Sequence, residues 1–112
     1  DKMVLCASSA YEKKFYLNEN FEGLPQHVKD ELKIMCVLFT EDVGGVLSLE
    51  FDENGNLELN TSADEGDLLY DEIGSVLKIK QMQQEKQELF ESLETYYKVF
   101  FLGEDIEDDN GD

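Results

Sequence analysis

The chain has 112 residues, with 27 acidic side chains against nine lysines, no arginine and one histidine, so its formal net charge is −18. Nucleic-acid recognition needs a positive surface that displaces counterions, and phosphate binding usually relies on the guanidinium fork of arginine. We therefore expect no nucleic-acid partner. Apolar residues still make up 41% of the chain, so we expect one folded domain rather than a disordered chain.

The first predicted elements are two short strands. Residues 4–6 form an apolar run, and residues 7–10 are a plausible turn. Tyr11, Lys13, Phe15 and Leu17 then alternate with polar or amphipathic side chains. This period of two indicates a strand with one covered face, although residues 10–14 would also tolerate a helix.

A helix is predicted to begin at Pro25, where the missing N–H costs nothing, and to end at Gly44-Gly45. Its apolar stripe has steps of three and four residues and consists of Val28, Leu32, Met35, Phe39 and Val43. Residues 34–39 are apolar on nearly all sides. We therefore expect this half of the helix to run through the centre of the core.

A β-hairpin is predicted next. Leu47, Leu49 and Phe51 alternate with polar residues, and Asn54-Gly55 is a strong turn signal because both residues tolerate positive φ.

The remaining chain reads as one long helix that begins near Asp64 or Asp67. Its apolar positions, in two stretches separated by Gly74-Ser75, are Leu69, Ile73 and Leu77, then Met82, Leu89, Leu93, Tyr96 and Phe100.

Together these elements predict an α+β domain over residues 1–103 with the order ββαββα. We expect a four-stranded antiparallel sheet covered by helices on one face, and a long last helix that Gly74 could kink. Residues 104–112 contain six acids and one isoleucine, which predicts a disordered acidic tail.

Two cysteines, Cys6 and Cys36, are too few for a disulfide-stabilised secreted domain. Cys36 lies in an apolar run, so we expect buried free thiols and a cytoplasmic protein. No apolar stretch approaches the ~20 residues that span a bilayer, so we expect no membrane partner. We also expect no cofactor.

Two groups of acids are candidate sites. Asp64, Glu65, Asp67, Asp71 and Glu72 fall within nine residues and could bind a basic partner. The other group combines Glu41 and Asp42, at a helix end where the dipole disfavours anions, with Asp71 and Glu72, and could hold a hard divalent cation. In the simpler alternative, all of these are separate solvated acids, and Asp64 or Asp67 caps a helix.

The sequence contains no identifiable nucleophile–base pair, and His27 has no second histidine to work with. We therefore expect that the protein is not an enzyme. Residues 96–102, which are largely aromatic and apolar, are either enclosed by the domain or form the surface of a weak homodimer.

Several stretches taken together resemble a family of short acidic uncharacterised proteins, a domain of unknown function, from anaerobic Gram-positive bacteria. The stretches are VLCAS (4–8), AYEKK (10–14), LKIMCVL with TED (32–38 and 40–42), YDEIGS (70–75) and VFFLGED (99–105). The resemblance covers about residues 3–105 and implies a bacterial cytoplasmic setting. It brings no activity, so no functional residues are carried over.

The sequence therefore favours a non-enzymatic cytoplasmic protein that presents an acidic surface to a basic macromolecule, because carboxylates can imitate spaced phosphates and steer association. We expect it to be a monomer or a weak homodimer through residues 96–102. The alternative is a domain that binds divalent cations through clustered carboxylates.

Overall fold

The computed structural model of the protein describes residues 2–104. The predicted disordered tail spans residues 104–112, and all of it after Glu104 lies outside the described residues. The elements, in chain order, are β1 (Met3–Ser9), β2 (Lys14–Leu17), a 3₁₀ turn η1 (Glu19–Phe21), α1 (Gln26–Val43), β3 (Val46–Phe51), β4 (Leu57–Ser62), α2 (Glu72–Glu85) and α3 (Gln87–Phe100).

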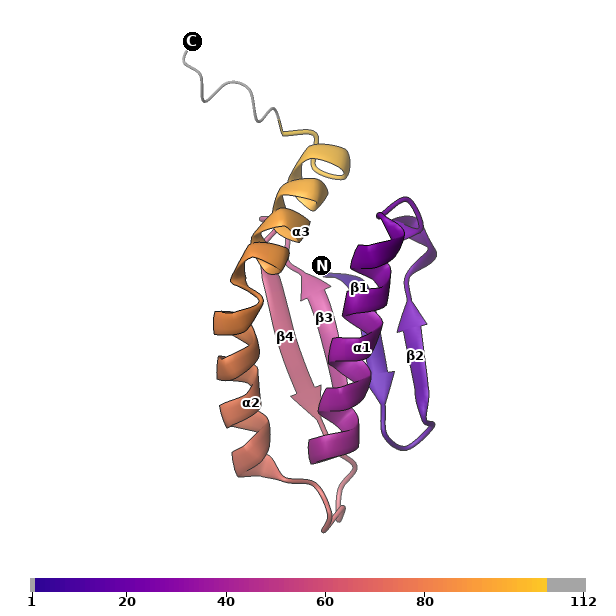
Figure 1. Cartoon of the computed structure of the whole chain (residues 1–112), viewed down its shortest axis with the longest axis vertical. Helices are drawn as coiled ribbons and strands as arrows, with labels where there is room; N and C mark the ends of the chain where they lie inside the picture. Colours follow the sequence, from indigo (N-terminus) through magenta and orange to yellow (C-terminus); the bar gives the residue numbers. More distant parts are fainter. Residues whose placement is uncertain (1, 105–112) are drawn as a thin grey trace.

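The four strands form one antiparallel sheet in the order β2-β1-β3-β4, with α1 in front of it and α2 alongside (Figure 1). In β3, the buried residues Leu47, Leu49 and Phe51 alternate with half-buried ones, so one face of the sheet carries the core. Cys6 and Ser8 of β1 pair with Leu49 and Leu47 and share that face. The α+β class and the antiparallel four-stranded sheet are confirmed.

The predicted order ββαββα is wrong, because two helices follow β4. Lys86 separates them with a non-helical backbone (φ −111°, ψ 24°). Before Lys86, α2 lies along α1. After Lys86, α3 packs its buried residues Phe90, Leu93 and Tyr97 into the core. A continuous helix could not follow both surfaces. The structure shows no kink at Gly74, which lies in the first turn of α2.

The first hairpin also differs from expectation. β1 extends to Ser9, and the turn falls at residues 10–13, where Lys13 adopts φ 56°. Tyr11 is therefore a turn residue rather than part of a strand. A register shift between Val4 and Cys6 lets both Leu5 and Cys6 be fully buried, although consecutive strand residues normally face opposite sides.

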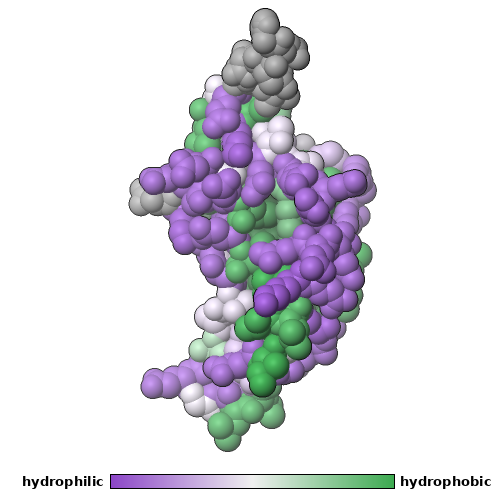
Figure 2. All heavy atoms as spheres, turned by 90° about the vertical axis from the view of Figure 1, so that its left-hand side faces the viewer, coloured by the Kyte–Doolittle hydropathy of each residue, from purple (hydrophilic) through white to green (hydrophobic). Residues whose placement is uncertain are grey.

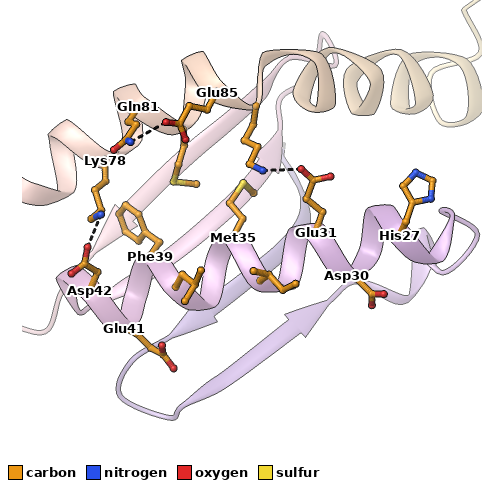
Figure 3. Close-up of a pocket in the computed structure, with 14 residues that line it drawn as sticks. His27, Asp30, Glu31, Met35, Phe39, Glu41, Asp42, Lys78, Gln81 and Glu85 are labelled. Carbon is orange, nitrogen blue, oxygen red and sulfur yellow. Dashed lines mark hydrogen bonds and ion pairs between the residues drawn. The ribbon is translucent and has the colours of Figure 1, made fainter.

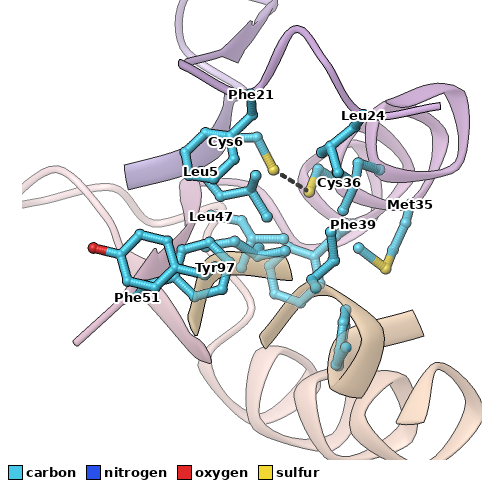
Figure 4. Packing of buried hydrophobic residues seen from close by; sticks show 14 of the residues in the cluster. Leu5, Cys6, Phe21, Leu24, Met35, Cys36, Phe39, Leu47, Phe51 and Tyr97 are labelled. Carbon is cyan, nitrogen blue, oxygen red and sulfur yellow. Dashed lines mark hydrogen bonds between the residues drawn. The ribbon is translucent and has the colours of Figure 1, made fainter. Parts of the chain in front are cut away.

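The C-terminal end of α3 is held by aromatic packing, shown in part in Figure 4. Phe51 and Tyr97 stack with ring centroids 4.3 Å apart, and Phe21 and Phe101 stack at 4.8 Å. Tyr96 is half-buried, whereas Phe100 remains 71% exposed. Within residues 96–102, Tyr97 is buried and Tyr96 and Phe101 pack partly against the core, and this aromatic packing fixes α3 on β3 and η1.

Between residues 2 and 104, none of the helices combines the length and the apolar character that crossing a bilayer requires.

Candidate functional site

An open hollow of about 920 Å³, with both charged and apolar lining residues, lies between α1 and α2. We call it the α1–α2 groove. In Figure 3, Glu31, Phe39 and Asp42 of α1 point toward α2, whereas Asp30 and Glu41 point away from it, at the edge of the hollow. The lining residues are His27, Asp30, Glu31, Ile34, Met35, Leu38, Phe39, Glu41, Asp42, Lys78, Gln81, Met82, Glu85 and Lys86.

The apolar part of the groove includes two side chains that the sequence had assigned to the core. Ile34 and Leu38 are 59% and 58% exposed, so the expectation that residues 34–39 run through the core centre is only half right. Met35 and Phe39 are buried beside them. The reason is geometric: α1 is covered on one side by the sheet and only partly by α2, which leaves an apolar strip uncovered.

Carboxylates surround this apolar strip. The groove is lined by five carboxylates, Asp30, Glu31, Glu41, Asp42 and Glu85, and by two lysines, Lys78 and Lys86. Lys78 Nζ lies 2.5 Å from Asp42 Oδ2, and Lys86 Nζ lies 2.8 Å from Glu31 Oε2. Both ion pairs cross from α2 to α1 (Figure 3). With His27 neutral, the groove keeps a net charge of −3.

One line of α1 carries most of this chemistry. Asp30, Ile34, Leu38 and Asp42 recur at steps of four, which places them on one side of the helix. This line was not predicted from the sequence, because the core stripe from Val28 to Val43 is sufficient to explain the helix. The signal that could have revealed it is the pair Ile34 and Leu38, two apolar residues four positions apart that do not belong to the core stripe.

The predicted acidic segment lies in the β4–α2 connection and lines a second hollow with all five of its acids. Two of its acids have local structural roles. Asp71 caps α2 by accepting a hydrogen bond from the Gly74 N–H at 2.8 Å. Asp67 accepts hydrogen bonds from the Tyr11 hydroxyl at 2.5 Å and from the Leu69 N–H at 2.9 Å, and these bonds hold its pKa below the usual value.

The predicted cation ligands come from two helix ends that are close in space, since the Asp71 N–H donates to the Val43 carbonyl at 3.0 Å. Asp42, however, pairs with Lys78, and Asp71 caps its own helix. Within residues 2–104, no three acidic, histidine or cysteine side chains are grouped so that they could hold a metal ion. Cation binding by Glu41, Asp42, Asp71 and Glu72 stays a prediction.

The two cysteines are buried free thiols, as predicted, with their sulfur atoms 3.9 Å apart across the contact of β1 with α1 (Figure 4). The hydrogen bond with Cys36, together with burial, raises the pKa of Cys6 well above its ordinary value. A buried neutral thiol is a poor nucleophile. These side chains therefore contribute packing.

A family model matches residues 2–105, nearly the whole chain. The chain belongs to a family of unknown function, DUF6145. None of the curated proteins and none of the solved structures matches it. Family membership thus supplies no activity to test against the groove, and any function must be argued from the residues themselves. What the groove offers is apolar contact between fixed negative charges.

Proposed function

We propose that this chain is a non-enzymatic interaction protein whose α1–α2 groove receives a basic, amphipathic segment of another macromolecule. The observation that carries the proposal is the combination in one hollow of exposed Ile34 and Leu38 with five carboxylates. Apolar contact supplies affinity when water is excluded, and the surrounding acids select a partner of opposite charge.

The two ion pairs across the groove are consistent with this role. Lys78 and Lys86 place ammonium groups against Asp42 and Glu31, so the groove already accepts cationic side chains in this geometry. Both pairs are partly exposed, with the lysine side chains 40% and 34% accessible. Such pairs contribute about 0–1 kcal/mol each, and a basic partner could displace them at small cost.

We place this interaction in the cytoplasm. The two buried free thiols support that setting, because oxidising compartments favour paired cysteines.

The test uses a synthetic amphipathic helical peptide of leucine and lysine, and a matched peptide with glutamate in place of lysine. Calorimetry should detect binding of the basic peptide only, with a dissociation constant that rises at least about tenfold between about 0.05 M and about 0.5 M NaCl. Amide NMR shifts should map to α1 and α2. Equal binding of the acidic peptide, or indifference to salt, would overturn the proposal.

Charge-reversal variants locate the site. Glu41→Lys should weaken binding of the basic peptide, whereas Glu12→Lys, in the β1–β2 turn and outside the groove, should not. Glu65→Lys tests the acidic segment that the sequence had favoured. If Glu65→Lys weakens binding more than Glu41→Lys does, the basic partner docks on the β4–α2 connection and the groove assignment is wrong.

A further inference from the structure

A second surface, separate from the groove, exposes apolar side chains on α2 and on the connection before it. Leu68 and Leu69 are 94% and 91% exposed, and Ile73, Val76 and Leu77 are 76%, 55% and 62% exposed. These are five of the eleven exposed large apolar side chains in the described part of the chain. Figure 2 shows apolar residues gathered in the lower part of this side of the molecule.

The outward side of α2 lacks a covering element. Within α2, all of which is described, Ser75 is the one buried residue, and Ile79 and Met82 pack partly against the core. Ile73, Val76, Leu77 and Lys80 lie on the opposite side of the helix at steps of three and four. We call these four residues the α2 stripe. An apolar stripe on a helix is normally buried against something.

Charge indicates what covers the stripe. The helix carries Glu72, Lys78, Lys80 and Glu85 and is neutral, in a chain of net charge −18. Acidic residues lie near the N-terminal end of the stripe, within residues 64–72, and Lys80 lies at its C-terminal end. A uniformly basic partner would meet Lys80, and a uniformly acidic one would meet Glu72. A surface that is acidic at one end and basic at the other matches a reversed copy of itself.

We propose that two copies of this chain associate through antiparallel α2 helices related by a two-fold axis. In such a contact, residue i of one copy faces residue j of the other, and the reverse. An axis between Val76 and Leu77 sets these two residues against each other and lays Ile73 on the methylene stem of Lys80 from the second copy. The same register brings Glu72 beside Lys80 of the second copy, twice.

Leu68 and Leu69 extend the contact. They lie in the connection just before α2, at the end of the helix that would run beside the C-terminal turn of the second copy's α2, and their nearly complete exposure leaves them available for this contact. This dimer uses α2 rather than residues 96–102, where the aromatic side chains mostly pack within the domain. It does not depend on the groove binding a basic partner.

Sedimentation velocity gives the first test. Because two copies of charge −18 repel each other, screening should favour the dimer, and its dissociation constant should fall about tenfold or more between about 0.05 M and about 0.5 M NaCl. Salt should weaken binding of the basic peptide but strengthen dimerisation, so a negative result for one proposal leaves the other standing. A protein that stays monomeric at both salt concentrations overturns the dimer.

Two matched variants locate the interface. Leu77→Glu should raise the dissociation constant at least about tenfold, and Leu38→Glu, at a site of similar exposure in the groove, should leave it unchanged. Circular dichroism confirms that each variant folds. Dissociation by Leu38→Glu but not by Leu77→Glu would place the contact at the groove and refute the α2 interface.

A charge exchange tests the register. Glu72→Lys alone and Lys80→Glu alone should each weaken self-association, because each variant sets like charges together across the axis. An equimolar mixture of the two variants restores both opposite-charge contacts, so native mass spectrometry should show heterodimers well above the roughly one-half share that random pairing gives. A statistical mixture would overturn the antiparallel register.

Discussion

Tyr11 ties two segments that are far apart in the chain. Its hydroxyl donates to Asp67 Oδ2 at 2.5 Å and accepts from the Asp64 N–H at 2.8 Å, so the β1–β2 turn holds the β4–α2 connection. The bond with Asp67 raises the pKa of Tyr11 and lowers the pKa of Asp67. The sequence placed Tyr11 in a strand, and only the tertiary structure brings it to the acidic segment.

Replacing Tyr11 by phenylalanine should let the pKa of Asp67 rise toward the ordinary aspartate value of about 3.9. A carboxyl group whose pKa is lowered by folding stabilises the fold fully when the pH is above its unfolded-state pKa. This contribution is lost as the pH falls through the lower pKa of the folded state. The raised pKa of Tyr11 acts in the opposite sense: its contribution is present below about pH 10 and lost as the pH rises through the raised value. The hydrogen bond is therefore intact at neutral pH.

Carboxyl-carbon NMR titration measures the pKa of Asp67 directly. Tyr16→Phe, on the half of the sheet away from this connection, is the control and should leave that pKa unchanged. An unchanged Asp67 pKa in Tyr11→Phe would mean that the backbone N–H of Leu69, rather than the hydroxyl, sets it.

At the scale of the elements, the parts of the fold that sequence predicts are those specified by local chemistry. The stripe from Val28 to Val43 fixes α1, and Asn54-Gly55 fixes the β3–β4 turn, where Gly55 has φ 87°. The break at Lys86 escapes prediction because the apolar period continues through it. Its cause is the direction of the surfaces on which α2 and α3 pack.

Periodicity also identifies which residues share a face without saying whether that face is covered. The sequence predicts that Leu69, Ile73 and Leu77 share one face of a helix; all three are mostly exposed, and Leu69 lies before α2 begins. The same limit applies to Ile34 and Leu38 in the groove. The candidate site was therefore missed for a physical reason: a stripe that packs inside the domain and one that packs on another molecule have the same sequence pattern.

The junction of α1 and β3 yields a stability prediction. Gly45 has φ +71°, and a Cβ added there would lie 2.5 Å from the Ser62 carbonyl oxygen and 2.8 Å from a ring carbon of Tyr70. Gly66 also has positive φ, +85°, with nothing within 4 Å of an added Cβ. Gly66→Ala should cost about 1–2 kcal/mol from backbone conformation alone, and Gly45→Ala about 1–3 kcal/mol more from the steric clash.

Urea unfolding of both variants gives the two free energies of unfolding. Equal losses would show that Tyr70 moves aside and that the close approach to Ser62 relaxes without cost.

At the scale of the whole molecule, charge is distributed unevenly. The chain has a net charge of −18, the α1–α2 groove one of −3, and α2 is neutral. A field of this sign attracts positively charged molecules from a distance and opposes the approach of a second copy. The charges of α2 balance locally, so the two proposed contacts, on different faces, are expected to respond to salt in opposite directions.

The order of strands in the sheet has a consequence for how the chain reaches this structure. β1–β2 and β3–β4 are local hairpins, whereas the central pair, β1 with β3, joins residues at least 37 positions apart, from Ser9 and Val46 to Met3 and Phe51. Closing that separation costs chain entropy before any contact compensates for it. We expect the two hairpins and α1 to be formed in the folding transition state and most of the β1–β3 pairing to form after it.

Stopped-flow kinetics can separate these stages. Thr61→Ala perturbs the β3–β4 hairpin, where Thr61 pairs with Leu47, and should slow folding. Val4→Ala perturbs β1–β3 pairing opposite Glu50, beyond the end of the β1–β2 ladder, and should mainly accelerate unfolding. The reverse pattern would mean that the central strands meet early. In that case the nucleus would be the long-range pair itself, and the hairpins would form around it.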